Sequence, residues 1–219
     1  ICGKPMLVHI IEQALILSPI KIGIIVGKYK KIIKETLLKY ISLNRIDFII
    51  QSEALGTGHA VQCCMSELTN YKNSNVLILS GDVPMLKSET MLEMVSKLNK
   101  VKIMATDFEN PSGYGRIIEK NSVFEKIIEE KDCDENQKKI KKVNCGIYAF
   151  NSDILCKYLM DIKNNNSQRE FYLTDIIEII KTNEKIDVDV FNISPLKHHE
   201  ITGINTIEQL MELEKLMMV

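Results

Sequence analysis

The sequence predicts an α/β protein in which helices flank a mixed, mainly parallel sheet. Three observations lead to this fold class. Short β-branched runs alternate with amphipathic stretches through the first half of the chain, as they do in β-α-β units. Shorter strands in the second half indicate an antiparallel or mixed excursion from that sheet. The composition, 45% hydrophobic and 26% charged over 219 residues, is that of an ordinary globular protein that can bury a large core.

In the first half, β-branched runs predict strands at residues 22–26, 48–51, 76–80 and 102–106. Amphipathic periodicity predicts helices between these strands, at residues 5–17, 29–40, 59–68 and 89–98. Ser88 directly precedes the last of these helices, so we expect its hydroxyl to cap free N–H groups there.

In the second half, the same patterns predict strands at residues 116–119, 123–128, 143–150 and 188–193, and helices at residues 154–160 and 174–180. Thr206 opens a final helix, with Gln209 at the spacing of a capping box. The apolar stripe of that helix is expected to comprise Ile207, Leu210, Met211 and Met217. No linker divides the chain, so we expect one domain across residues 1–219.

Charge and composition exclude several classes of partner. The 28 Lys and Arg residues nearly balance the 29 Asp and Glu residues, so there is no basic excess for binding nucleic acid or a membrane surface. The longest apolar runs fall far short of the roughly 20 residues that cross a bilayer. Because the first residues also lack the pattern of a secretory signal, we expect a cytoplasmic protein. The six cysteines include no C-x-x-C pair, which indicates reduced thiols.

The clearest chemical signal follows the strand predicted at residues 76–80. There Gly81 and Asp82 would emerge at the carboxyl edge of a parallel sheet, where ligands of open α/β folds bind. An aspartate in this place is suited to hold Mg²⁺ beside phosphates, although it could simply cap the loop. Pro84 occupies the position of a second acid, which argues against a D-x-D glycosyltransferase.

A second signal is the glycine-punctuated turn that follows Gln51. Gly56 and Gly58 would let the backbone approach a ligand closely, Thr57 offers a hydroxyl, and the next helix begins with unpaired N–H groups. The Gln51 amide carries both a donor and an acceptor, as reading a pyrimidine edge requires. An ordinary strand-to-helix turn would explain the glycines equally well.

Three weaker signals lie further along the chain. Gly113 and Gly115 bracket a tyrosine before a strand, which is also typical of a simple turn. Asn144 lies inside an apolar strand, where its amide needs a partner, whether a ligand or backbone. Asn205 precedes the last helix and by itself would most simply be its cap. The chain has no recognisable nucleophile motif, no G-x-x-x-x-G-K-[ST] loop and no G-x-G-x-x-G motif, which argues against hydrolases, P-loop ATPases and simple dehydrogenases.

Taken in order, these motifs resemble the sugar-phosphate nucleotidyltransferases, and specifically the uridyltransferase domain of the N-acetylglucosamine-1-phosphate uridyltransferases. The motifs that carry the resemblance span the chain: Gly3-Lys4-Pro5-Met6, Gln51, Leu55 to Ala60, Gly81-Asp82-Val83-Pro84, Gly113-Tyr114-Gly115-Arg116, Glu129 to Asp132, Asn144, Phe171 to Asp175 and Gly203-Ile204-Asn205. The resemblance implies a Rossmann-like fold. It also implies a reaction in which UTP and N-acetylglucosamine 1-phosphate give UDP-N-acetylglucosamine and pyrophosphate.

The resemblance also implies roles for individual residues. Asp82 and Asn205 would be catalytic through the Mg²⁺ that they coordinate. Nucleotide-binding residues would be Gln51, Gly56, Thr57, Ser80, Gly81 and Asp82, and sugar-binding residues would be Gly115, Glu129 and Asn144. Relatives often carry tyrosine in place of Ser80, so we expect a looser contact with the nucleotide ribose.

Two expectations concern segments outside the printed sequence. The family begins with a strand, a glycine-rich loop and a lysine that embrace the triphosphate, and we expect these to precede Ile1, over roughly 30 residues by the resemblance. Bacterial relatives continue into an acetylating β-helix, and we expect uridyl transfer only. Two alternatives stay open: transfer to another sugar 1-phosphate such as glucose 1-phosphate, and a non-catalytic nucleotide-sugar sensor.

Overall fold

The computed structural model describes residues 1–217. Its α-helices are α1 (Met6–Ile16), α2 (Lys30–Leu37), α3 (Thr57–Gln62), α4 (Met65–Leu68), α5 (Ser88–Val95), α6 (Ser152–Tyr158), α7 (Asp175–Glu184) and α8 (Ile207–Met217). Its strands are β1 (Ile22–Val26), β2 (Ile46–Ile50), β3 (Asn75–Ile78), β4 (Val101–Asp107), β5 (Arg116–Lys120), β6 (Val123–Ile128), β7 (Lys142–Asn151) and β8 (Asp189–Asn192). A short 3₁₀ segment, η4 (Pro195–Ile201), precedes α8.

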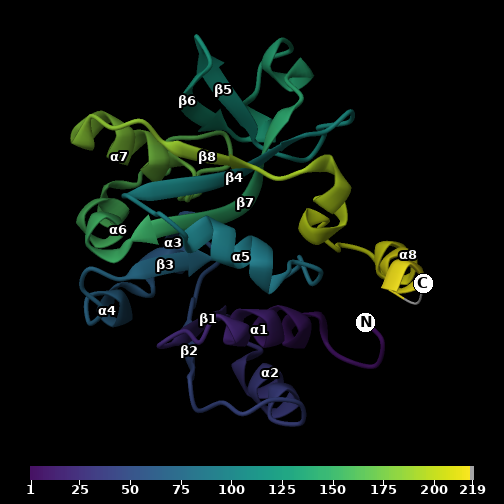
Figure 1. Cartoon of the computed structure of the whole chain (residues 1–219). Helices are drawn as coiled ribbons and strands as arrows, with labels where there is room; N and C mark the ends of the chain where they lie inside the picture. Colours follow the sequence, from purple (N-terminus) through teal and green to yellow (C-terminus); the bar gives the residue numbers. More distant parts are fainter. Residues whose placement is uncertain (218–219) are drawn as a thin grey trace.

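The strands of the described residues form two sheets (Figure 1). β1 and β2 pair in parallel beside α1 and α2. The larger sheet has the order β6-β5-β7-β4-β8, and β3 also pairs with β7. The β4–β8 ladder is parallel, whereas β7 pairs antiparallel with β3, β4 and β5. The predicted mixed sheet flanked by helices is confirmed, and the antiparallel excursion of the second half centres on β7.

β7 is the strand that organises the site. One edge of β7 pairs with β4 at residues 148–150 and again at residues 142–144, with a bulge between the two stretches. Two strands pair with the opposite edge of β7: β3 pairs with residues 148–151, and β5 pairs only at Val143. The intervening residues 144–147 therefore face a break in the sheet, at which the loop after β3 and the loop before β5 meet.

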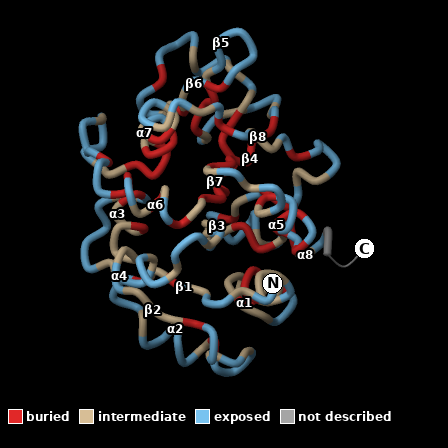
Figure 2. The backbone as a smooth tube through the Cα atoms, turned by 60° about the vertical axis from the view of Figure 1, so that its left-hand side comes forward, coloured by how far each residue is buried: buried red, intermediate tan, exposed pale blue. Residues whose placement is uncertain are grey.

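The core lies on both faces of the larger sheet, and buried backbone concentrates along β4 and β7 (Figure 2). Alternation of side chains along each strand sends Ile103 and Phe150 to one face, and Met104 and Ala149 to the other. The first face packs against α6 and α7, and the second against α1 and α5. A third cluster joins α1 and α2 to the small sheet.

The predicted helix at residues 59–68 is wrong as a single element. The structure contains α3 and α4 with a turn at Cys63 and Cys64 between them. The N–H of Cys64 bonds to the carbonyl of Val61, only three residues back, at 2.9 Å. This tighter hydrogen bond ends the regular helix.

The predicted capping of α5 by the Ser88 side chain is also wrong. Ser88 is the first residue of α5, and its side chain makes no capping hydrogen bond. Instead the backbone N–H of Ser88 bonds to Gln13 Oε1 of α1 at 3.0 Å, and the N–H of Lys87 bonds to Glu200 Oε2 of η4 at 3.1 Å. Tertiary contacts therefore cap this helix, which no local pattern reveals.

The capping box of α8 is confirmed, but its apolar stripe is partly wrong. Thr206 Oγ1 accepts from the N–H of Gln209 at 3.2 Å, and Gln209 Oε1 accepts from the N–H of Thr206 at 3.1 Å. Leu210 packs inward beside Leu213, whereas Ile207 and Met211 are 69% and 58% exposed. The side chain predicted at Met217 lies outside the described residues.

Two further expectations concern the whole chain. All six cysteines are free thiols, as predicted. Among the helices of residues 1–217, none has both the length and the apolar character to cross a membrane. The strand and glycine-rich loop expected before Ile1 stay a prediction.

Candidate active site

Asp82 lies in the loop that follows β3, as the sequence predicted, although β3 ends at Ile78 and not at Ser80. The parallel partner expected for this strand is not present among the described residues, because β3 pairs there only with β7 and in the antiparallel sense. A second loop, between η4 and α8, meets it there. The backbone N–H of Ile204 donates to the carbonyl of Asp82 at 2.9 Å. This hydrogen bond joins two segments that are far apart in sequence and brings Asn205 to the same place as Asp82.

Gly203 separates the two predicted metal ligands. A Cβ atom at Gly203 would lie 3.3 Å from Asp82 Oδ2 and 4.0 Å from Asn205 Nδ2. The polar ends of both side chains therefore converge on the space beside this glycine. Asp82 is partly exposed and Asn205 exposed, so solvent and ligands can reach both groups.

The donor chemistry of this pair suits a hard divalent cation. A carboxylate and an amide carbonyl are oxygen ligands, and Mg²⁺ typically takes one or two of these from the protein and the rest from phosphates and water. Nowhere in residues 1–217 do three or more His, Cys, Asp or Glu side chains form a group that could hold a metal. An all-protein metal cage is thus absent from the described residues, and a shared protein-and-phosphate site is the arrangement that the pair fits.

The loop after β2 positions Gln51, Gly56 and Thr57. Gln51 Nε2 donates to the carbonyl of Gly56 at 3.1 Å and to His59 Nδ1 at 3.0 Å. Both N–H groups of the Gln51 amide are used in this way, and its carbonyl oxygen makes no hydrogen bond within the described residues. A cleft of about 340 Å³ opens beside this loop, and its lining includes Leu55 and His59.

Gly56 is required by both its backbone and its surroundings. Its φ is 109°, and a Cβ atom would lie 2.6 Å from the carbonyl oxygen of Phe171. The N–H of Phe171 donates to the carbonyl of Leu55 at 2.8 Å, and the N–H of Gly58 donates to the carbonyl of Phe171 at 2.7 Å. Because glycine has no side chain, the backbone of Phe171 can pack directly against this loop.

The three residues predicted to bind a sugar also converge. A Cβ atom at Gly115 would lie 3.3 Å from Glu129 Oε2, and the carbonyl of Gly115 accepts from the N–H of Asn144 at 2.9 Å. Within the chain, the Asn144 amide donates to the hydroxyl of Tyr148 at 2.6 Å and accepts from the N–H of Gly146 at 3.2 Å. This buried amide thus has the partners that its position requires.

The Glu129 carboxyl occupies a largely desolvated position. Burial raises its pKa, a hydrogen bond from Thr174 opposes that effect, and the charge of Asp132 adds to it. Thr174 Oγ1 donates to Glu129 Oε1 at 2.9 Å, which leaves Oε2 on the side of Gly115. Thr174 carried no signal of its own in the sequence beyond its place in the segment 171–175.

The segment 171–174 links the two halves of the site. Besides the backbone bonds of Phe171, the N–H of Leu173 donates to Thr57 Oγ1 at 3.0 Å. On the other side Thr174 holds Glu129. The loop predicted to bind the base and the carboxylate predicted to bind the sugar are therefore fixed to one short stretch of chain.

Ser80 and Tyr114 complete the junction around the break in the sheet. Ser80 Oγ donates to the carbonyl of Gly146 at 3.4 Å, which ties the end of β3 to β7. Burial raises the pKa of Tyr114, and the charges of Cys145 and Asp82 raise it further. The Tyr114 hydroxyl therefore lies within electrostatic range of Asp82. Gly81 is exposed beside them.

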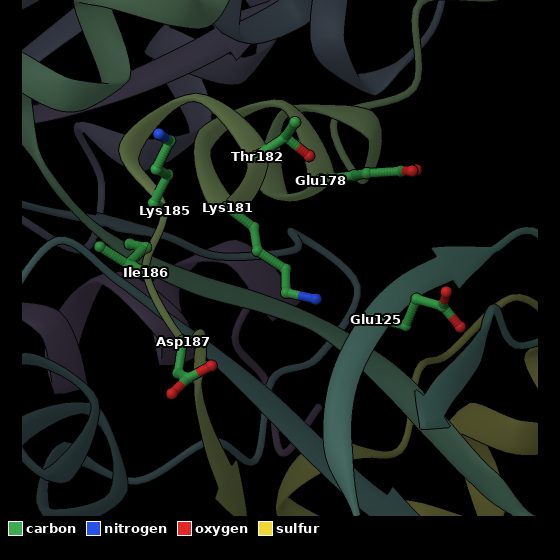
Figure 3. Close-up of a pocket in the computed structure, with 7 residues that line it drawn as sticks. All are labelled: Glu125, Glu178, Lys181, Thr182, Lys185, Ile186 and Asp187. Carbon is green, nitrogen blue, oxygen red and sulfur yellow. The ribbon is translucent and has the colours of Figure 1, made fainter. Parts of the chain in front are cut away.

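Another cleft, of about 410 Å³, lies elsewhere (Figure 3). It is bordered by β6 and the end of α7, and the Lys181 side chain extends toward Glu125 there, whereas the Lys185 amine points away from both Glu125 and Glu178. None of the residues singled out from the sequence lines it. The convergent polar groups, and not cavity size, identify the candidate site.

A scan against protein families matches residues 1–196 to the family described as nucleotidyl transferase. A mimivirus protein named "Probable UDP-N-acetylglucosamine pyrophosphorylase" is 42% identical over 217 residues, which cover 97% of this chain and 85% of the viral protein. The "Bifunctional protein GlmU" of Clostridium botulinum is 37% identical over 223 residues, covering 99% of this chain and 47% of that protein. The chain thus spans about half the length of GlmU.

Among solved structures, UDP-glucose pyrophosphorylase complexed with UDP-glucose superposes with a TM-score of 0.64 at 16% identity, covering 86% of this chain and 78% of that chain. This likeness concerns the fold. It agrees with the predicted Rossmann-like arrangement of a mixed sheet between helices. With the family match over most of its length and the viral relative at 42% identity, the chain belongs to the nucleotidyl transferase family of enzymes.

Proposed function

We propose that this protein transfers the uridylyl group of UTP to N-acetylglucosamine 1-phosphate, giving UDP-N-acetylglucosamine and pyrophosphate. The name of the viral relative, a probable UDP-N-acetylglucosamine pyrophosphorylase, supports this choice of substrates. The observation that carries it is the convergence of Asp82 and Asn205 beside Gly203, at the mouth of the break in the sheet. This is where two phosphate-bearing substrates can meet.

Asp82 and Asn205 are the residues that would hold Mg²⁺. The reaction joins two anions, and a bound divalent cation would neutralise part of their charge and that of the leaving pyrophosphate. The carboxylate of Asp82 supplies the only formal charge of the pair. Its position is fixed by the backbone hydrogen bond to Ile204. In this proposal the protein contributes positioning and charge complementarity and no nucleophile.

The loop around Gln51 is suited to a uracil base. The free carbonyl oxygen of Gln51 can accept a hydrogen bond from the ring N–H of uracil, because its amide N–H groups are already held by Gly56 and His59. Gly56 and Thr57 would bring backbone and hydroxyl groups to the same edge. Ser80 and Gly81 would face the ribose.

The groups around β7 are suited to a sugar. Glu129 Oε2 can accept from sugar hydroxyls beside Gly115, where a larger residue would occupy the space. The amide of Asn144 is oriented by Tyr148 and Gly146. Since the segment 171–174 fixes both loops, the base and the sugar would be held at a constant separation.

The experiment is an assay of pyrophosphate release by the full-length protein with UTP, N-acetylglucosamine 1-phosphate and Mg²⁺. Asp82→Asn removes the charge but keeps the size, and is expected to reduce kcat about 100-fold or more, on the order of 2.7 kcal/mol. Asp187→Asn is the control, because Asp187 is an exposed aspartate that lines the separate cleft beside α7, which contains none of the site residues, and it should retain the parent rate. If Asp82→Asn also retains that rate, the metal assignment is wrong.

A second candidate is transfer to another sugar 1-phosphate, above all glucose 1-phosphate. The structural likeness to UDP-glucose pyrophosphorylase favours keeping it. A panel of sugar 1-phosphates and nucleoside triphosphates in the same assay separates the two candidates by kcat/KM. Binding of UDP-N-acetylglucosamine without turnover of any pair would instead identify a nucleotide-sugar sensor.

A further inference from the structure

The two candidate metal ligands lie on two chain segments that run beside each other in opposite directions. Segment 82–87 connects Asp82 to the start of α5, and segment 200–205 connects the end of η4 to Asn205. Two hydrogen bonds cross between them. The N–H of Ile204 donates to the carbonyl of Asp82 at 2.9 Å, and the N–H of Lys87 donates to Glu200 Oε2 at 3.1 Å.

Glu200 is an unusual residue for this place. Glu200 is buried, with only 3% of its surface exposed. No ion pair within residues 1–217 includes it. A buried carboxylate is costly unless hydrogen bonds and local dipoles stabilise it. Here the N–H of Lys87 and the positive end of α5 provide that stabilisation.

Apolar packing holds the same two segments together. Val83 and Leu86 are buried in one cluster with Ile201. Met85 packs in another cluster with Ile204. Such packing brings the segments into contact but does not select a register between them, because apolar contacts are not directional. The two hydrogen bonds, one at each end, select it.

We propose that Glu200 is a positioning residue for the metal site: its carboxylate fixes the register of segment 200–205 against segment 82–87, and so sets the separation of Asp82 and Asn205. The proposal rests on the proposed function, in which those two side chains share a divalent cation. Glu200 itself does not touch the cation. Its loss leaves both ligands present but lets one segment shift relative to the other.

The test uses Mn²⁺ as a paramagnetic probe, with its binding to the full-length protein measured by EPR in the presence of UDP-N-acetylglucosamine. Glu200→Met removes the acceptor but keeps an unbranched side chain of similar length. It is expected to weaken Mn²⁺ binding about tenfold, which corresponds to about 1.4 kcal/mol. Glu200→Gln keeps an acceptor oxygen for the N–H of Lys87, and should bind Mn²⁺ within about threefold of the parent.

Gln13→Met is the matched control, because Gln13 caps the neighbouring N–H of α5, that of Ser88, from α1. It removes one hydrogen bond from the same helix end without touching segment 200–205. Thermal unfolding should show a loss of stability in both methionine variants, whereas Mn²⁺ binding should weaken only in Glu200→Met. Equal weakening in the two variants, or none in Glu200→Met, would overturn the proposal.

Asp82→Asn separates this proposal from the proposed function. If the parent binds Mn²⁺ with product and Asp82→Asn abolishes the binding, the metal site stands, and the Glu200 variants alone decide the positioning role. If the parent shows no such binding, both proposals fail. Should Glu200→Met not fold, hydrogen exchange on the parent decides: the Lys87 amide must slow at least threefold when Mg²⁺ and UDP-N-acetylglucosamine are added, and an unchanged rate refutes the coupling.

Discussion

Replacing Gly56 with alanine tests whether the stability of the protein depends on the close packing of the base-binding loop against Phe171, in the segment 171–174. The φ of Gly56 is 109°, and the new Cβ would lie 2.6 Å from the carbonyl oxygen and 2.9 Å from the nitrogen of Phe171. With a ψ of 173°, Gly56 lies in a backbone region that is essentially confined to glycine, and a non-glycine residue there costs about 1–3 kcal/mol. Moving the Phe171 backbone away would also break its hydrogen bonds to Leu55 and Gly58, at about 0.5–1.5 kcal/mol each. The expected loss of unfolding free energy is therefore about 2–6 kcal/mol.

Two other glycines separate these contributions in urea denaturation followed by circular dichroism. Gly113 has a φ of 87° but nothing within 4 Å of its added Cβ, so Gly113→Ala should lose only the backbone strain, about 1–2 kcal/mol. Gly81 has neither feature, and Gly81→Ala should stay within about 0.5 kcal/mol of the parent. A loss in Gly56→Ala no greater than in Gly113→Ala would refute the argument, because it would mean that the Phe171 hydrogen bonds survive.

Three further substitutions test the electrostatics of the fold and the positioning of Glu129 in the site. Asp175→Asn should raise the urea midpoint at pH 8 but not at pH 4. Burial, and then the charge of Glu129, raises the pKa of Asp175 to about 6 from 3.8, so its ionisation between these values favours the unfolded chain. Glu184→Gln should act with the opposite sign, because hydrogen bonds led by that from Lys100 lower the pKa of Glu184 to about 2; its loss of stability should be full above pH 5 and fade toward pH 2. Thr174→Val should raise the KM for N-acetylglucosamine 1-phosphate several-fold and leave the KM for UTP unchanged, because it frees Glu129, whereas Thr174→Ser should retain both values.

Elements with strong local periodicity were predictable from the sequence. The bounds predicted for residues 22–26 and 123–128 coincide with β1 and β6, since both runs are rich in β-branched residues and are followed by Gly27 and Glu129, respectively. The break between α3 and α4 was not predictable, because Cys63 and Cys64 continue the apolar pattern and neither glycine nor proline marks the turn. Strand order was equally hidden. Nothing local to β3 indicates that it pairs with β7, because Asn75 pairs with Asn151 and Ile78 pairs with Tyr148, far along the chain.

In the candidate site, too, some residues could be predicted from the sequence, whereas the contacts between them could not. Asp82, Gly56 and Gly115 could be singled out because each follows or precedes a predicted strand and carries a residue type with a specific chemical or conformational use. The convergence of Asp82 with Asn205 could not be derived from spacing and came from the resemblance. The structure supplies its physical basis in the hydrogen bond between Ile204 and Asp82. The contacts expected with base, sugar and metal stay predictions.

Residues that hold the site in place are the hardest to find from sequence, and Glu200 shows why. A glutamate between a histidine and an isoleucine has no local signature, and by composition alone it would be assigned to the surface. Its only partner in the described chain, the N–H of Lys87, is 113 positions away. Because helix α5 lacks a local cap, its first N–H groups are satisfied only when η4 and α1 are already in place. The hydrogen bond from Lys87 to Glu200 therefore fixes both the loop that leads into α5 and the loop that follows η4. One of these loops carries Asp82 and the other carries Asn205, so the stability of α5 and the geometry of the candidate metal site depend on the same carboxylate.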